Sequence, residues 1–277
     1  MTEPIETVVA GFPALYAQGE NGRRRLPIVF QHGLWGTDLQ LAPFLRFFSA
    51  AGFDCYAACR RGRRGVPPER AGGVRFDDFL EDALSVLDAI HPAPIVIGWS
   101  LGGLVAQKIA EAGRCCAAVL LAPVAPGGIH VAPRLGSLPT YLRHSLDILF
   151  GLPFELSKRN ATNLLMNRVE ESERQRLFES LVPDSGRVAR DFTLAGVAVD
   201  ESKVRCPVLC IVGTEDNAAP ARSVRRVASK YGAELREYPG RGHWLHEEPG
   251  FEMIAAEIVS WLEQHVLQPS AANASPA

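Results

Sequence analysis

A glycine–serine–glycine turn constrains this chain more than any other feature of its sequence. The turn Gly98-Trp99-Ser100-Leu101-Gly102 follows the apolar run 94–97 and opens a helix-like segment over 104–111. Glycine two positions before and after the serine is needed where strand and helix backbones approach too closely for side chains. A turn this tight presents the serine at its apex. The pattern therefore predicts a strand–turn–helix unit with Ser100 as a candidate nucleophile.

An acid and a histidine follow this serine in loops of their own. Asp216 lies just after the apolar run 208–212, with Glu215 as its near rival, and His243 lies in the turn 240–244 before the final helical segment. A histidine can take the proton of a serine hydroxyl while a carboxylate fixes its tautomer and stabilises its cation. We therefore expect Ser100, His243 and Asp216 to act together.

The chain except its ends resembles the α/β-hydrolase superfamily, which has the same chain order of serine, acid and histidine. The resemblance is carried by Gln-His-Gly-Leu-Trp-Gly at 31–36, the turn with its continuation to Gln107, and His-Trp-Leu-His-Glu-Glu-Pro at 243–249. It looks closest to small, cofactor-free serine hydrolases, the esterase and lysophospholipase-like group. It implies a mostly parallel eight-stranded sheet flanked by helices, with a helical lid inserted after strand 6. Some relatives place the acid after that strand, where 122–125 holds no carboxylate here.

The alternation of apolar runs and helical segments also predicts a parallel sheet with helices on both faces, hence an α/β fold. A chain of 277 residues suits one such domain. The alternation breaks between 122 and 203, where the pattern is helical. We expect a core formed by residues 1–122 and 204–267, a lid over 123–203, and a disordered tail over 268–277.

Two backbone N–H groups are expected to form an oxyanion hole, those of Leu34 and Leu101, although Trp35 could replace Leu34 as the donor. The lid's first helical segment has an apolar face, which either covers the serine or only fastens the lid to the core. Trp99 is either a packing residue or part of the pocket wall. The candidate substrate-binding residues are Trp35, Trp99, Tyr141, Leu142, Leu146, Leu149, Phe150, Phe154 and Trp244.

Composition excludes several other classes. The net charge of −2 gives no general attraction to nucleic acid. No stretch reaches the roughly 18 apolar residues of a membrane span, and the first residues lack the pattern of a signal peptide. Six cysteines without a C-x-x-C motif favour a reducing compartment, so we expect a cytoplasmic protein.

Metal and cofactor sites are not expected. His243 and His246 form an H-x-x-H in a loop, but His243 already has a role in the triad and the other histidines are scattered. No nucleotide-binding glycine motif is present. Oligomeric state is left open by the sequence.

The favoured hypothesis is a carboxylic-ester hydrolase, with thioesters and lactones as related substrates, that forms an acyl-enzyme on Ser100. The apolar lid suggests a largely apolar acyl or alcohol group. Carbon–carbon bond hydrolases and cofactor-free dioxygenases or haloperoxidase-like enzymes share the fold, and a ligand-binding receptor is a third class. Activity that survives Ser100→Ala but not His243→Ala would indicate a dioxygenase.

Overall fold

In the computed structural model, which describes residues 2–20, 25–64 and 73–267, eight strands form one sheet in the order β1-β2-β4-β3-β5-β6-β9-β10. The neighbouring strands β4, β3, β5, β6, β9 and β10 pair in parallel in that order. The pairs β1–β2 and β2–β4 are antiparallel. This confirms the predicted mostly parallel eight-stranded sheet. The strands are β1 (Ile5–Val9), β2 (Phe12–Ala17), β3 (Ile28–Gln31), β4 (Cys55–Ala58), β5 (Ile95–Trp99), β6 (Ala117–Leu121), β9 (Val208–Gly213) and β10 (Glu234–Tyr238).

The central strands are continuously apolar because both of their faces are covered. Every residue of β3, β5, β6 and β9 is buried, whereas the edge strands β1 and β10 contain exposed residues. This is the expected pattern of a parallel sheet between two helical layers.

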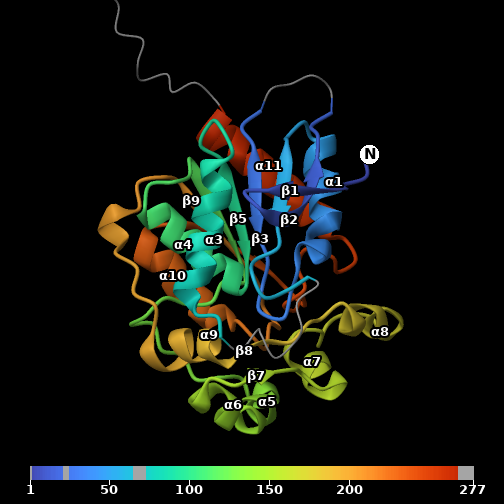
Figure 1. Ribbon diagram of the computed structural model, residues 1–277, viewed down its shortest axis with the longest axis vertical. Helices are drawn as coiled ribbons and strands as arrows, with labels where there is room; N and C mark the ends of the chain where they lie inside the picture. The colour runs from blue at the N-terminus through green and yellow to red at the C-terminus, as the bar shows by residue number, and fades with distance from the viewer. Residues whose placement is uncertain (1, 21–24, 65–72, 268–277) are drawn as a thin grey trace, which may run out of the picture.

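Helices cover both faces of the sheet (Figure 1). Helices α1 (Ala42–Ala50) and α11 (Phe251–Leu262) pack together on one face, with the rings of Phe44 and Phe251 5.9 Å apart. The other face carries α3 (Phe76–Asp88), α4 (Leu101–Glu111) and α10 (Ala221–Tyr231). In the described residues, short 3-10 turns occur at Asp38–Leu41, Leu135–Ser137 and Glu201–Lys203, and π-helical turns at Asp191–Ala195 and Glu263–Leu267.

A helical insertion between β6 and β9 lies across the carboxyl ends of the central strands (Figure 1). It contains α5 (Leu138–Arg143), α6 (Ser145–Phe150), α7 (Lys158–Leu164), α8 (Glu171–Glu179) and α9 (Gly186–Arg190), with the short strand pair β7 (Pro153–Phe154) and β8 (Asp184–Ser185). Ligands of parallel α/β sheets bind at the carboxyl ends of the strands, so the insertion covers the place where a site is expected. The predicted domain boundaries remain predictions, and the expected tail over 268–277 lies outside the described residues.

None of the helices in the described residues combines the length and the apolar character needed to cross a membrane.

Candidate active site

The turn between β5 and α4 has the strained conformation that its sequence predicts. Ser100 has φ +56° and ψ −118°, in a region that non-glycine residues rarely occupy. A Cβ on Gly98 would lie 2.2 Å from the Gly102 carbonyl oxygen, and one on Gly102 would lie 2.0 Å from the Gln31 carbonyl oxygen. Both glycines are therefore required by backbone contacts. The Ser100 N–H donates to the Leu121 carbonyl at 2.9 Å, which fixes the turn on the neighbouring strand.

The acid and the histidine meet below this turn. The Asp216 carboxylate accepts from His243 Nδ1 at 2.7 Å, and both side chains are buried. Its other oxygen accepts from the N–H groups of Ala218 and Ala219 at 2.8 Å. Since a carboxylate only accepts, His243 carries its proton on Nδ1, and Nε2 is left with a free lone pair.

The contact between serine and histidine is not made in this conformation. Among the described residues, His243 Nε2 is buried and has no hydrogen-bond partner. Ser100 is half-buried and lines a cavity, and the ring of the preceding Trp99 lies 5.4 Å from the His243 ring. The structure thus joins two of the three expected residues and leaves Nε2 available to a hydroxyl that turns toward it.

Hydrogen bonds fix the loop after β3, and they determine whether the N–H of Leu34 or that of Trp35 is free to bind an oxyanion. Trp35 has φ +56°; its N–H donates to Asp184 at 2.6 Å, and its carbonyl accepts from the Val182 N–H at 2.9 Å. The Trp35 N–H is therefore occupied. The Leu34 N–H donates to no other residue in the described part of the chain, and Leu34 lines the same cavity as Ser100.

On the other side, a buried histidine and arginine hold the start of this loop. Arg60 donates to the carbonyl oxygens of His32 at 2.6 Å and Gly33 at 3.1 Å, and its guanidinium lies over the Phe79 ring. Burial, with Arg63 nearby, lowers the pKa of Arg60 to about 9. Burial and the charge of Arg60 hold the pKa of His32 well below its ordinary value. A neutral His32 that braces the loop fits a structural role.

A cavity of about 80 Å³ lies beside Ser100, between the sheet edge and the insertion. Three predicted pocket residues line it: Trp35, Tyr141 and Phe154. Burial and the charge of Asp216 raise the pKa of Tyr141 to about 12, so this ring remains a neutral phenol near the site. The other lining residues are Leu34, Ser100, Val124, Thr140, His144, Ile148, Leu164, Leu165, Ala189, Phe192, Thr193 and Ala218.

Comparison with known proteins identifies the family of the chain. The pattern of the Alpha/beta hydrolase family matches residues 28–256. The chain belongs to this family. Over 236 residues it is 25% identical to a monoacylglycerol lipase of Mycolicibacterium smegmatis, covering 79% of this chain and 81% of that protein.

Solved structures of similar fold include two lipases. The monoacylglycerol lipase of Paleococcus ferrophilus has a TM-score of 0.69 at 24% identity, covering 91% of this chain and 98% of that one. A soluble variant of monoglyceride lipase from Saccharomyces cerevisiae has a TM-score of 0.73 at 17% identity, covering 96% of both chains.

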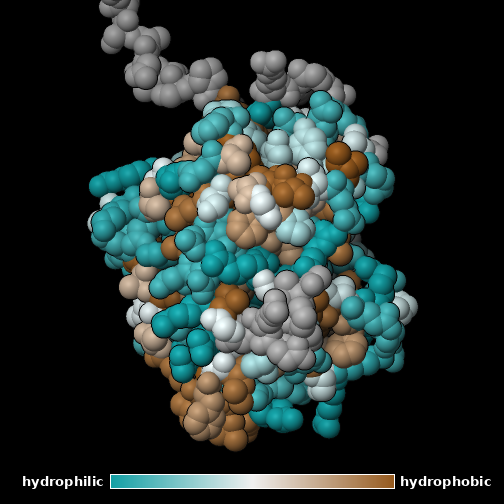
Figure 2. All heavy atoms as spheres, in the orientation of Figure 1, coloured by the Kyte–Doolittle hydropathy of each residue, from teal (hydrophilic) through white to brown (hydrophobic). Residues whose placement is uncertain are grey.

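The first helical segment of the insertion in this alpha/beta hydrolase departs from the sequence prediction. One continuous apolar face was expected, but the helix breaks at His144, which has φ −102° and ψ 10°. Residues 140, 141, 144 and 148 face the cavity instead. Four predicted pocket residues are exposed to solvent by half or more: Leu142, Leu146, Leu149 and Phe150. Figure 2 shows apolar side chains gathered over α5 and α6 at the lower end of the molecule.

Two predicted pocket tryptophans of this alpha/beta hydrolase lie outside the cavity lining. Trp99 and Trp244 are fully buried, with ring centroids 4.9 Å apart, and Trp99 Nε1 donates to the His243 carbonyl at 2.9 Å. They form the packed layer beneath the histidine loop, because the tight turn directs Trp99 into the core. The packing interpretation of Trp99 fits this position.

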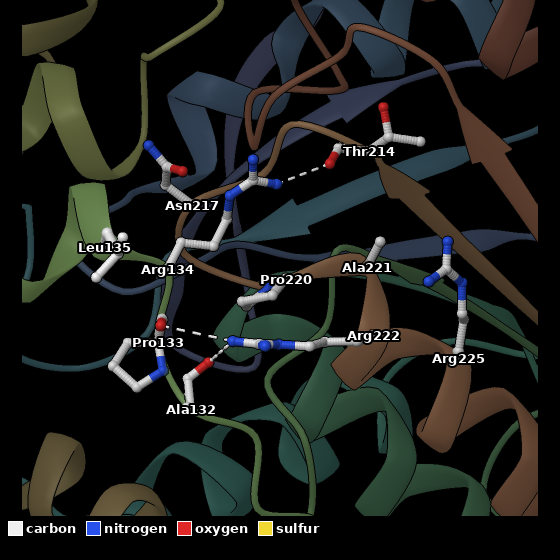
Figure 3. Close-up of a pocket in the computed structure, with 10 residues that line it drawn as sticks. All are labelled: Ala132, Pro133, Arg134, Leu135, Thr214, Asn217, Pro220, Ala221, Arg222 and Arg225. Atoms are coloured by element: carbon white, nitrogen blue, oxygen red, sulfur yellow. Dashed lines mark hydrogen bonds between the residues drawn. The ribbon is translucent and has the colours of Figure 1, made fainter.

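A larger hollow of the hydrolase, about 740 Å³, lies at the start of α10 and is lined by several arginines (Figure 3). Its guanidinium groups have protein partners: Arg222 donates to the Ala132 carbonyl, Arg134 to the Thr214 carbonyl at 2.8 Å, and Arg225 pairs with Glu237. Ser100 does not line it, whereas Ser100 lines the small cavity. The small cavity beside Ser100 is therefore the candidate reaction site.

Sequence reasoning missed two residues of the site, Asp184 and Thr140. Asp184 contacts the loop after β3 across about 150 residues of chain, which no local pattern reveals. Thr140 is a polar position within an apolar segment, and such an interruption was the only sequence signal available.

Proposed function

We propose that this protein is a serine hydrolase that cleaves a carboxylic ester with a largely apolar acyl or alcohol group. The observation that carries the proposal is the buried Asp216–His243 pair, whose free Nε2 lies at the same sheet edge as a strained, half-buried serine. Structural histidines seldom combine a carboxylate on one nitrogen with an unpartnered second nitrogen, because an unpaired buried polar atom destabilises the fold.

In the proposed reaction, the Ser100 hydroxyl turns toward His243 Nε2, gives up its proton and attacks the ester carbonyl carbon. Asp216 stabilises the imidazolium that forms. The N–H groups of Leu34 and Leu101 donate to the oxyanion, and the alcohol leaves with the proton from His243. Water, activated by the same histidine, then hydrolyses the acyl-enzyme. The reaction requires no cofactor.

The shape of the site supports an ester with one small group near Ser100 and a longer apolar group. The cavity of about 80 Å³ holds only a few non-hydrogen atoms. It shares Val124, Tyr141 and Phe192 with an adjoining groove of about 530 Å³. The monoacylglycerol lipases to which the chain is similar support a substrate of this general kind.

A second candidate function rests on the missing serine–histidine contact. A cofactor-free dioxygenase of this fold would use the histidine–acid pair as a base, and that pair is the part of the triad already joined. Such an enzyme would tolerate the loss of Ser100.

The two functions are separated by Ser100→Ala and His243→Ala, assayed with p-nitrophenyl esters of increasing chain length. The ester-hydrolase proposal predicts a burst of p-nitrophenol in the wild type and loss of both burst and turnover in either variant. Full activity of Ser100→Ala would end the proposal. If His243→Ala were then inactive, the histidine–acid pair alone would act as the base, as the second candidate function requires.

A further inference from the structure

Three buried polar atoms around the catalytic cavity lack a partner in the described part of the chain. They are Trp35 Nε1, Thr140 Oγ1 and His144 Nε2, each almost inaccessible to solvent. All three residues line the cavity that also contains Ser100. Buried polar groups of folded proteins nearly always have a hydrogen-bond partner, and the exceptions call for a ligand or a water molecule.

The three side chains belong to one wall of the cavity. Thr140 and His144 are one helical turn apart, and the His144 N–H donates to the Thr140 carbonyl at 3.1 Å. The rings of Trp35 and His144 both pack against Phe154, at 5.3 and 5.1 Å. The β3 loop and the insertion thus bring their unpaired atoms to the same aromatic side chain.

The hydrogen-bonding character of each atom can be assigned. His144 Nδ1 lies 2.9 Å from the Asp147 carboxylate. Since the carboxylate accepts, Nδ1 carries the proton of the neutral ring, and Nε2 is an acceptor. Trp35 Nε1 is only a donor, and the Thr140 hydroxyl can be either. The wall therefore offers at least one donor and one acceptor to a group in the cavity.

We propose that Trp35, Thr140 and His144 form a subsite for a hydroxyl group of the substrate. This rests on the proposed ester hydrolysis and adds to it a preference for hydroxylated esters. The hydroxyl oxygen accepts from Trp35 Nε1, and its proton is donated to His144 Nε2 or Thr140 Oγ1. An alkyl group would leave all three atoms unpaired, and a carboxylate would set a negative charge against the His144 lone pair.

The kinetic test uses two pairs of esters with equal numbers of non-hydrogen atoms. Ethylene glycol monobutyrate and propyl butyrate place the hydroxyl on the alcohol side; methyl lactate and methyl isobutyrate place it on the acyl side. In the wild type, we expect kcat/KM of the hydroxylated member to exceed that of its partner by about tenfold or more in one pair. His144→Phe and Thr140→Val should each lower this ratio toward one.

Thr140→Ser keeps the hydroxyl and should keep the ratio, which separates lost hydrogen bonding from lost packing. Thr140→Val is close in shape to threonine and serves as the informative variant if His144→Phe does not fold. A wild-type ratio of one or less in both pairs would overturn the proposal, as would variants that retain the wild-type ratio; either result would assign the unpaired atoms to bound water.

A binding measurement separates failure of the subsite from failure of the proposed reaction. Isothermal titration of Ser100→Ala with ethylene glycol monobutyrate and propyl butyrate needs no turnover. The subsite predicts tighter binding of the glycol ester, with the difference abolished by adding His144→Phe. Equal affinities, including no measurable binding of either ester, would overturn the subsite, whereas loss of ester turnover alone would bear only on the proposed reaction.

Discussion

Asp184 joins the insertion to the loop that carries the proposed oxyanion donor, and removing its carboxylate should damage both stability and turnover. One oxygen accepts from the Trp35 N–H at 2.6 Å, and Arg63 lies 2.5 Å from the same oxygen. The other oxygen accepts from the Ser185 N–H at 2.6 Å. Both side chains of the ion pair are 1% exposed, so the pair is hidden from water.

Asp184→Ala leaves the Arg63 charge buried without its partner and the Trp35 N–H unpaired. Breaking one side of a buried ion pair costs about 3 to 5 kcal/mol of unfolding free energy. Trp35 is held at a positive φ that an aromatic residue rarely adopts, so we expect its release to move the adjacent Leu34 N–H. Loss of one oxyanion donor lowers turnover by about 100- to 1,000-fold.

Two control variants separate the charge from the hydrogen bond. Asp184→Asn keeps an acceptor for the Trp35 N–H, so it should lose stability but retain most of the turnover. Combining Arg63→Met with Asp184→Leu removes both charges, so it should recover stability without recovering turnover. Urea unfolding and p-nitrophenyl butyrate kinetics measure the two quantities. Wild-type turnover in Asp184→Ala would refute the claim that this carboxylate positions the loop.

Three further predictions concern other parts of the molecule. Gly102→Ala would place its Cβ 2.0 Å from the Gln31 carbonyl oxygen, so we expect a large loss of thermal stability and of ester hydrolysis; a stable, active variant would contradict the close approach. Burial, with His243 nearby, lowers the pKa of His246 to about 3. Because the unfolded chain binds a proton near pH 6.5 and the folded chain does not, this histidine lowers the unfolding free energy by about 2 kcal/mol from pH 7.5 to pH 5. Urea unfolding of His246→Phe should show a smaller loss over that interval, and an unchanged loss would contradict a neutral buried ring. Phe154→Ala should lower kcat/KM for ester hydrolysis because it removes a cavity wall, whereas Phe150→Ala on the exposed surface should not, and equal effects would argue against this cavity.

The core was predictable because its signals are local. The strands Ile95–Trp99 and Val208–Gly213 lie over the apolar runs 94–97 and 208–212, and the glycines flanking Ser100 do prevent a backbone clash. The Asp216–His243 contact follows from two loops at the carboxyl ends of neighbouring parallel strands, β9 and β10. Residues fixed at strand ends can be placed from the order of the strands alone.

The insertion was not predictable in the same way. The expected apolar face would have turned Leu142, Leu146 and Leu149 toward the serine, but the cavity is lined by Thr140, His144 and Ile148, which recur every four residues on another face. Periodicity defines the faces of such a segment, but tertiary packing decides which face meets the sheet. The Asp184 contacts likewise depend on tertiary packing of a loop that only the fold brings to Trp35.

The most direct test of the central claim is to locate the residue that a fluorophosphonate modifies. We predict one adduct per chain, carried by Ser100 in the peptide that spans β5 and α4, with labelling lost in Ser100→Ala and strongly slowed in His243→Ala and Asp216→Ala. An adduct on another residue, or a wild-type enzyme that hydrolyses esters and is not modified, would contradict the account.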